Sequence, residues 1–516
     1  MEWLADLVSG FLRLSALLLI FALGTAILYT AYLYWVDVHQ TKHAIRRNYP
    51  VIGRFRYIFE HLGEFFRQYF FAMDREELPF NRAQRSWVYR AAKNLDSTVA
   101  FGSTRSLNQA GEVIFLNGLF PVMEEDALPP ATITFGEGYA RQPFSTNTIF
   151  NISGMSFGAL SVPAIKALSK GARKAGIWLN TGEGALSPFH LEGGCDLIFQ
   201  LGTAKYGVRK DDATLDEEKL KTVAAHDQVR MFEIKLSQGA KPGKGGILPA
   251  AKVTNLIAST RGIPEGQASN SPNGHVDIRN IDELLDMVQR VRNITGKPTG
   301  FKVVVGNSQW LDEICQIIQR RGLEYAPDFI TVDSADGGTG AAPQALMDFV
   351  GLPLKRSLPL VVDKLTEYGL RERIRVIASG KLINPSDVAS ALCVGADMAV
   401  SARGFMFALG CIQALQCNKN TCPTGITTHN PELQKGLDPT NKSNRVAHYV
   451  KNMVHEVEVI AHSCGVSEPR QLRRRHAHVI DGNGIPKPML ELYPEVTNRA
   501  RAAQALAETE EATTDN

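Results

Sequence analysis

RVIASGKLINPSDVASALCVGADMAVSARG, residues 375–404, contains two short apolar runs, at 375–379 and 397–401, separated by a stretch of helical character. Each run ends in a polar loop that contains glycine, 379–381 (SGK) after the first and 402–404 (ARG) after the second. Short apolar runs that alternate with helical stretches are typical of a parallel α/β sheet. The segment therefore predicts two parallel strands joined by a helix.

The same pattern extends from about residue 148 to residue 401. Eight runs fit it, at 149–153, 177–181, 197–201, 231–236, 301–305, 328–332, 375–379 and 397–401. Eight parallel strands favour a TIM (β/α)8 barrel, whose active site is built from loops at the carboxyl ends of the strands. The predicted fold class is therefore α/β, with a TIM barrel as the main body.

The unusual residues of the chain lie in loops that follow these runs. The loops are 153–158 (SGMSFG), 180–184 (NTGEG), 235–246 (KLSQGAKPGKGG), 333–340 (DSADGGTG), 379–381 (SGK) and 401–404 (SARG). Glycine lets a backbone approach a flat ring or a phosphate. Because the last two loops follow the seventh and eighth strands, where such barrels bind phosphate, the pattern favours FMN.

Two other nucleotide-binding motifs do not fit these loops. Residues 239–245 (GAKPGKG) are one residue too short for a Walker A loop and lack Ser or Thr after the lysine. Residues 337–340 (GGTG) lack the spacing of a dinucleotide-binding fingerprint. Neither a P-loop nor a Rossmann site is therefore predicted.

Three of the seven cysteines, Cys411, Cys417 and Cys422, lie within twelve residues. Thiolates this close together favour a soft metal centre over a disulfide framework, and three ligands fit a 3Fe-4S cluster best. A 4Fe-4S cluster with a remote fourth ligand, a zinc site completed by His429, and three plain buried thiols stay open. The other cysteines are scattered, so we expect a reducing compartment.

Residues 14–35 form an uncharged apolar run about 33 Å long as a helix, which is enough to span a bilayer. The acidic start at Glu2 and Asp6 and the length of the run argue against a cleaved signal peptide. Lys and Arg residues follow at 42–56, which places the downstream chain in the cytoplasm. We expect a single-pass cell-membrane protein whose catalytic domain is cytoplasmic.

Four regions are predicted. Residues 1–37 are a transmembrane anchor, 38–109 a membrane-proximal helical segment that packs on the main domain or lies along the membrane, 110–470 the barrel with its iron–sulfur loop, and 471–516 a C-terminal extension. The polar tail from Ala500 is expected to be disordered, and the basic stretch 473–478 to lie on the surface. The net charge of +3 gives no reason to expect a nucleic-acid partner.

Five motifs, in order, resemble the FMN-binding synthase domain of glutamate synthase. They are 152–161 (ISGMSFGALS), 180–184 (NTGEG), 238–243 (QGAKPG), 336–341 (DGGTGA) and 410–428, which holds the three clustered cysteines. The resemblance covers about residues 110–470. It implies that ammonia condenses with 2-oxoglutarate to give 2-iminoglutarate, and that reduced FMN passes a hydride to the imine carbon while an iron–sulfur cluster relays the electrons.

The resemblance also implies roles for particular residues. Glu183 would help to organise the site, Lys241 and Arg261 would hold the dicarboxylate, and Lys302, near the start of the fifth run, would lie beside the pyrimidine edge of the flavin. The implied cofactor-binding residues are Ser153, Gly154, Met155, Ser156, Lys235, Gln238, Lys302, Asp336, Gly337, Gly338, Ser379, Gly380, Lys381, Ala402, Arg403 and Gly404. Cys411, Cys417 and Cys422 resemble the cluster ligands.

The chain also departs from the family pattern. It starts with Met1 and the apolar run in place of a glutamine-hydrolysing domain, and no pyridine-nucleotide module is visible, so we expect external ammonia and electrons from ferredoxin or another donor protein. Residues 269–277 (SNSPNGHVD) replace a proline-rich, double-histidine loop. Two alternatives therefore stay open: an N-methylglutamate synthase-type subunit that uses methylamine, and a membrane-tethered flavin and iron–sulfur electron carrier without synthase activity.

Overall fold

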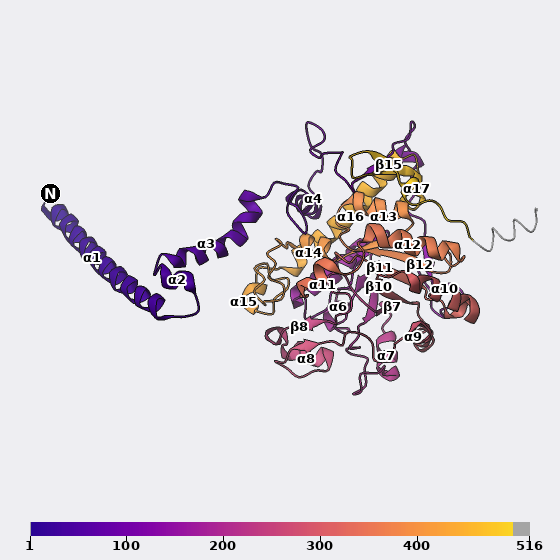
Figure 1. Cartoon of the computed structure of the whole chain (residues 1–516), viewed down its shortest axis with the longest axis horizontal. Coiled ribbons are helices and arrows are strands. Elements are labelled where there is room, and N and C mark those ends of the chain that lie inside the picture. The colour runs from indigo at the N-terminus through magenta and orange to yellow at the C-terminus, as the bar shows by residue number, and fades with distance from the viewer. Residues whose placement is uncertain (1, 499–516) are drawn as a thin grey trace, which may run out of the picture. The chain divides into compact units, whose positions relative to one another are not determined.

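The computed structural model describes residues 2–498, apart from the side chains of residues 64, 65, 67 and 68 (Figure 1). The described chain divides into two compact units, with the boundary between Ala83 and Gln84. The four regions expected from the sequence remain predictions. The predicted disordered tail from Ala500 lies outside the described residues.

The first unit consists of helices. They are α1 (Glu2–His39), α2 (Ala44–Asn48), α3 (Gly53–Phe66) and the π-helix η1 (Arg67–Phe71). By length and composition, α1 can cross a membrane, with a mean hydropathy of 2.2 in its apolar window, none of which is buried. Helix α1 begins at Glu2, well before the apolar run at 14–35. Residues 2–13 contain no proline, so nothing in them interrupts the helix.

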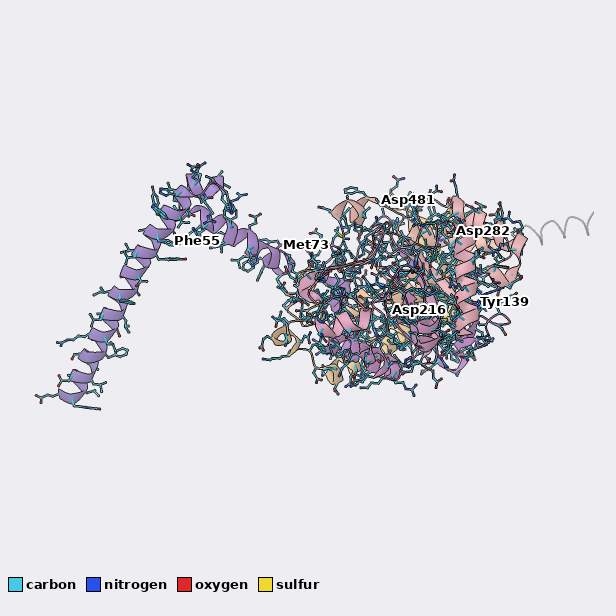
Figure 2. The ribbon with its side chains drawn as sticks, turned by 90° about the horizontal axis from the view of Figure 1, so that it is seen from below. Phe55, Met73, Tyr139, Asp216, Asp282 and Asp481 are labelled. Atoms are coloured by element: carbon cyan, nitrogen blue, oxygen red, sulfur yellow. The ribbon has the colours of Figure 1, made fainter. Side chains whose placement is uncertain are left out.

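Asp37 fixes the short helices to the end of α1. Its carboxylate is fully buried and pairs with Arg46 at 2.8 Å and with Arg54 at 2.7 Å. Both arginines come from the segment that follows α1, so the chain folds back at this point. In α3 the side chains of Phe55 (Figure 2), Ile58, Phe59, Leu62 and Phe66 are exposed.

The second unit is a closed barrel of eight parallel strands. They are β4 (Phe150–Ile152), β5 (Leu179–Asn180), β6 (Leu197–Leu201), β7 (Val229–Lys235), β10 (Thr299–Val304), β11 (Phe329–Asp333), β12 (Arg375–Ser379) and β13 (Met398–Ser401). Each strand pairs with the next along the chain, and β13 returns to β4. Each overlaps one of the eight predicted runs, so the TIM barrel is confirmed.

Helices surround the barrel (Figure 1). The longer ones are α4 (Arg82–Ala92), α5 (Val162–Ala175), α7 (Glu217–Ala224), α9 (Ile281–Thr295), α10 (Gln309–Arg321), α12 (Leu354–Glu367), α13 (Pro385–Val394) and α16 (Pro439–Ser463). Shorter ones are α6 (Pro188–Leu191), η3 (Ala250–Lys252), α8 (Asn255–Arg261), α11 (Gln344–Phe349), α14 (Arg403–Leu409), α15 (Pro431–Gln434) and α17 (Met489–Leu492). Because the helices cover their outer face, the strands are almost wholly buried and most of their residues are apolar.

An aromatic hairpin closes the amino-terminal end of the barrel. Strands β2 (Ile133–Phe135) and β3 (Phe144–Thr146) are antiparallel. Phe135 packs edge-on against Trp178 and Phe329, which lie at the starts of barrel strands. Neither strand is predicted from the sequence, because three-residue strands are too short to show alternation.

The C-terminal segment forms a small sheet with the chain that precedes the barrel. Strand β14 (Ala477–Ile480) pairs antiparallel with β1 (Val113–Phe115) and with β15 (Pro486–Pro488). The basic stretch 473–478 is only partly on the surface: Arg474 is buried and pairs with Asp363. Its charge therefore serves the packing of this segment.

Candidate active site

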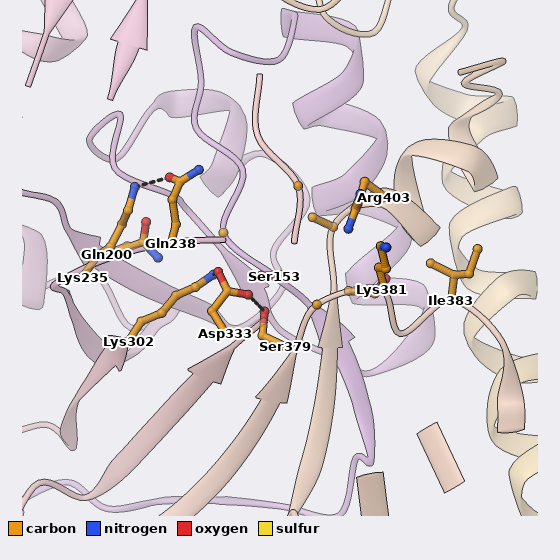
Figure 3. A pocket seen from close by; sticks show the side chains of 15 residues that line it. Ser153, Gln200, Lys235, Gln238, Lys302, Asp333, Ser379, Lys381, Ile383 and Arg403 are labelled. Atoms are coloured by element: carbon orange, nitrogen blue, oxygen red, sulfur yellow. Dashed lines mark hydrogen bonds and ion pairs between the residues drawn. The ribbon is translucent and has the colours of Figure 1, made fainter. Parts of the chain in front are cut away.

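A polar cavity opens at the carboxyl ends of the barrel strands (Figure 3). Predicted cofactor-binding residues make up most of its lining, namely Ser153, Gly154, Lys235, Gln238, Lys302, Gly338, Ser379, Gly380, Lys381, Ala402 and Arg403. The cavity is also lined by Gln200, Asp333, Ile383 and Ser401, which are not among the predicted cofactor-binding residues.

Five predicted cofactor-binding residues lie off the lining: Met155, Ser156, Asp336, Gly337 and Gly404. Asp336 pairs with Lys381 at 2.8 Å and so holds the position of this lysine, which lines the cavity. A Cβ at Gly404 would lie 2.3 Å from the hydroxyl of Tyr449, so this glycine is needed for helix packing.

Lys302 and Asp333 form a buried ion pair on the cavity wall (Figure 3). Lys302 Nζ lies 3.1 Å from Asp333 Oδ2. Although burial opposes both charges, each holds the other ionised, which raises the pKa of Lys302 and lowers the pKa of Asp333. Lys302 is the fourth residue of β10, which begins at Thr299, earlier than the sequence indicated.

Two cations and a close backbone form the wall at the ends of β12 and β13. Figure 3 shows Lys381 and Arg403 on this side, across the cavity from Lys235 and Gln238. Gly380 has φ +115°, and a Cβ there would lie 2.3 Å from the Cβ of Ser334. Burial lowers the pKa of Arg403 to about 10, partly offset by Asp336. This wall can bind an anionic group such as phosphate.

A buried carboxylate organises the floor of the cavity. Glu233, in the middle of β7, accepts hydrogen bonds from Asn180 Nδ2 at 2.8 Å, Gln200 Nε2 at 2.7 Å and Thr331 Oγ1 at 2.6 Å. These donors come from three other strands. Gln200 is therefore held in one orientation where it faces the cavity.

Beside the cavity, one carboxylate lies among three cations. Glu183 pairs with Lys235 at 2.9 Å, and Lys241 and Arg261 act on it from farther away. Although burial opposes its charge, these cations lower the pKa of Glu183. Burial also lowers the pKa of Lys241 to about 8, partly offset by Glu183. The structure thus brings the three predicted catalytic residues together, although none of them lines the cavity itself.

The guanidinium of Arg261 is held in place by neighbouring groups, and one of its N–H donors has no hydrogen-bond partner among the described residues. Its Nη2 donates to the carbonyl oxygen of Phe157 at 2.9 Å, and the guanidinium lies 5.2 Å from the ring centroid of Tyr206. The Tyr206 hydroxyl is 2.7 Å from Ser269 Oγ. Among residues 2–498, Arg261 Nε has no hydrogen-bond partner. This donor is available to an acceptor that the protein does not supply.

The three clustered cysteines are free thiols on one loop. Cys411 Sγ accepts from the Gln413 backbone N–H at 3.4 Å, and Cys422 Sγ lies 3.3 Å from Thr424 Oγ1. Burial, together with the charges of Cys417 and Cys422, raises the pKa of Cys411 to about 12. The donor chemistry and the mutual proximity of these thiols fit a soft metal centre.

The loop is not a preassembled metal site. Among residues 2–498, no group of three or more His, Cys, Asp or Glu side chains is arranged to hold a metal ion. His429, the possible fourth zinc ligand, has its Nε2 2.8 Å from the carbonyl oxygen of Gly158. The side chain of His429 therefore has another partner in this structure.

These features define an α/β-barrel protein with a cation-rich pocket at the carboxyl ends of its strands. Residues 121–467 match the family model for the conserved region in glutamate synthase. Because this match covers more than half of the chain, the chain belongs to the glutamate synthase family. The resemblance of its five motifs is confirmed.

Individual proteins agree with this assignment. The glutamate synthase large subunit-like protein YerD of Bacillus subtilis is 38% identical over 484 residues, covering 86% of this chain and 91% of YerD. The archaeal glutamate synthase [NADPH] of Methanocaldococcus jannaschii is 34% identical over 349 residues, covering 67% of this chain. The chain spans 64% of the length of that archaeal protein.

Solved structures show a weaker likeness. A mandelate oxidase mutant with a monooxide FMN adduct matches with a TM-score of 0.42 and 15% identity, covering 77% of this chain and 92% of the oxidase. A flavocytochrome b2 mutant with benzoylformate matches with a TM-score of 0.45 and 13% identity, covering 87% and 90%. Likeness at this level supports no conclusion about ligands or activity.

Proposed function

We propose that this chain is a glutamate synthase-like oxidoreductase that reduces 2-iminoglutarate, formed from 2-oxoglutarate and ammonia, to glutamate. The charge around Glu183 supports this most directly. Lys235, Lys241 and Arg261 share this one carboxylate, which leaves two positive charges uncompensated among the four groups. A dicarboxylate supplies two negative charges, and Arg261 can grip one of its carboxylates.

The cavity beside this cluster is proposed to bind FMN, which when bound supplies the hydride. Lys381 and Arg403 would hold its phosphate, since both are cationic and line the same wall. A Cβ at Gly338 would lie 2.8 Å from Arg403 Nε, so the Arg403 side chain packs directly against the backbone at this glycine. Asp333 would keep Lys302 charged beside the bound group.

Cys411, Cys417 and Cys422 are proposed to hold a 3Fe-4S cluster, with 4Fe-4S and zinc as the alternatives. The support is the donor set itself, three thiols on one loop that affect one another's charge. Such a cluster passes single electrons, which we propose come from ferredoxin or another donor protein. Helix α1 is proposed to anchor the enzyme in the cell membrane with the barrel in the cytoplasm.

Anaerobic stopped-flow absorbance of the chemically reduced, full-length protein tests the proposal. Adding 2-oxoglutarate with ammonium should reoxidise the flavin and form glutamate. Lys241→Met and Arg261→Met should abolish this reaction, whereas Lys221→Met, an exposed lysine paired with Glu218, should not. The matched control separates loss of the substrate site from a general effect of charge.

Each alternative function gives its own result. A protein that forms N-methylglutamate with methylamine, and no glutamate with ammonium, is the methylamine-using type. A protein that holds FMN and iron and is not reoxidised by either pair is an electron carrier. Either result overturns the proposal that ammonia is the amine.

A further inference from the structure

Lys252, at the end of η3, is a charged side chain with 2% of its surface exposed. Its Nζ donates to the carbonyl oxygen of Ala159 at 2.9 Å and to that of Cys417 at 3.2 Å. Within residues 2–498, no carboxylate forms an ion pair with it. Carbonyl groups orient an ammonium group but carry no net charge, so the positive charge of Lys252 is buried without a carboxylate to balance it.

The cysteine loop is in direct contact with Lys252, through the carbonyl oxygen of Cys417. Burial lowers the pKa of Lys252 to about 8, Arg261 acts in the same direction, and negative charge on Cys417 and Cys422 opposes both. A buried cation without an opposite charge is strongly unfavourable. Anionic sulfur at these two cysteines, as in a thiolate-bound metal centre, would supply the missing negative charge.

Hydrogen bonds keep Lys252 in contact with this loop. Asn420 Nδ2, between the second and third cysteines, donates to the carbonyl oxygen of Ala251 at 3.0 Å. The hydroxyl of Tyr89, on α4, donates to the carbonyl oxygen of Cys411 at 2.6 Å. The cysteine loop is thus tied to η3 and to α4, and the ammonium of Lys252 cannot move away without breaking its own two bonds.

Lys252 also links the cysteine loop to the cavity. Ala159, its other partner, lies in the loop after β4, and the start of that loop contributes Ser153 and Gly154 to the cavity wall. One positive charge therefore bridges the loop proposed to hold a metal centre and the loop after β4, whose first residues line the cavity.

We propose that Lys252 is the counter-charge of a thiolate-bound metal centre at Cys411, Cys417 and Cys422 and sets its reduction potential. The inference rests on the iron–sulfur centre of the proposed function. One-electron reduction by a donor protein adds a negative charge to a centre that is already anionic. A nearby cation in a buried site stabilises the reduced form more than the oxidised form, so Lys252 raises the potential without gaining or losing a proton.

The test is an anaerobic redox titration of the full-length protein as purified, with the centre followed by electron paramagnetic resonance and the iron content measured. Lys252→Met and Lys252→Gln remove the charge, and Lys252→Arg keeps it. As a control, Lys244→Met removes an exposed lysine from the segment between β7 and η3. The midpoint potential should fall in both neutral variants and stay at the parent value in Lys252→Arg and Lys244→Met.

Other outcomes are equally decisive. Loss of iron from both neutral variants, with iron retained in Lys252→Arg, would also support the proposal, because charge would then be what the centre requires. Neutral variants that keep both iron and the parent potential would overturn it, as would loss of iron from all three variants whether or not they fold. A parent protein without iron would overturn the centre itself, whereas an unchanged potential overturns only the role of Lys252.

Discussion

The ammonium of Lys302 lies 3.1 Å from the carboxylate of Asp333, and this pair connects the ends of three barrel strands. Lys302 belongs to β10 and Asp333 ends β11. Asp333 Oδ1 also accepts from Ser379 Oγ, at the end of β12, at 2.8 Å, and Oδ2 accepts from the Gly239 N–H at 2.9 Å. The carboxylate thus orders the cavity wall as well as balancing Lys302.

Replacing Asp333 by Asn should destabilise the protein strongly. The variant leaves the buried ammonium of Lys302 without an opposite charge, which typically costs about 3–5 kcal/mol. The free energy of unfolding, measured in urea, should fall by that amount. Asp282→Asn is the control, because Asp282 is an exposed residue (Figure 2) paired with Arg321, and pairs with an exposed carboxylate contribute about 0–1 kcal/mol. Equal effects of the two substitutions would contradict this account.

Replacing Arg261 by Lys should weaken binding of 2-oxoglutarate while leaving the charge in place. Lysine cannot form two parallel hydrogen bonds to one carboxylate, nor stack on Tyr206 as a flat guanidinium does. We expect KM for 2-oxoglutarate to rise about tenfold, equivalent to about 1.4 kcal/mol. Arg290→Lys, on the surface beside Glu217, should leave KM unchanged. An unchanged KM in Arg261→Lys would show that this guanidinium does not hold the substrate.

His190 should make stability depend on pH. Burial lowers its pKa from 6.5 to about 3, so between these values the unfolded chain binds a proton that the folded protein does not. Stability is therefore full above pH 6.5 and is lost as the pH falls, by at most about 1.4 kcal/mol per pH unit. His190→Gln should flatten the dependence of the unfolding free energy between pH 7 and 5, whereas the exposed His226→Gln should not. A parent profile as flat as that of His190→Gln would exclude this cause.

The sequence predicts the barrel because each of its strands is a short apolar run between polar segments, as at 375–379. It also locates most of the cavity wall, since residues such as Gly380 and Lys381 follow a strand directly. Gln200 and Glu233 are not predicted as site residues because they lie inside strands, where a polar residue gives no local sign that it faces the barrel interior. Lys252 has no local signal at all, because only the fold brings it to Cys417.

Two arginines in the middle of α1 should release the protein from the membrane. Leu18 and Phe21 lie on the exposed apolar surface of this helix, and an arginine near the centre of a span costs about 2.5–3.5 kcal/mol. After a carbonate wash, the Leu18→Arg, Phe21→Arg variant should appear in the soluble fraction and the parent in the membrane pellet. Glu2→Arg, at the end of the helix, should behave like the parent, because an arginine there can reach the interface. A parent found in the soluble fraction, or a double variant retained in the pellet, would show that α1 does not hold this protein as a membrane span.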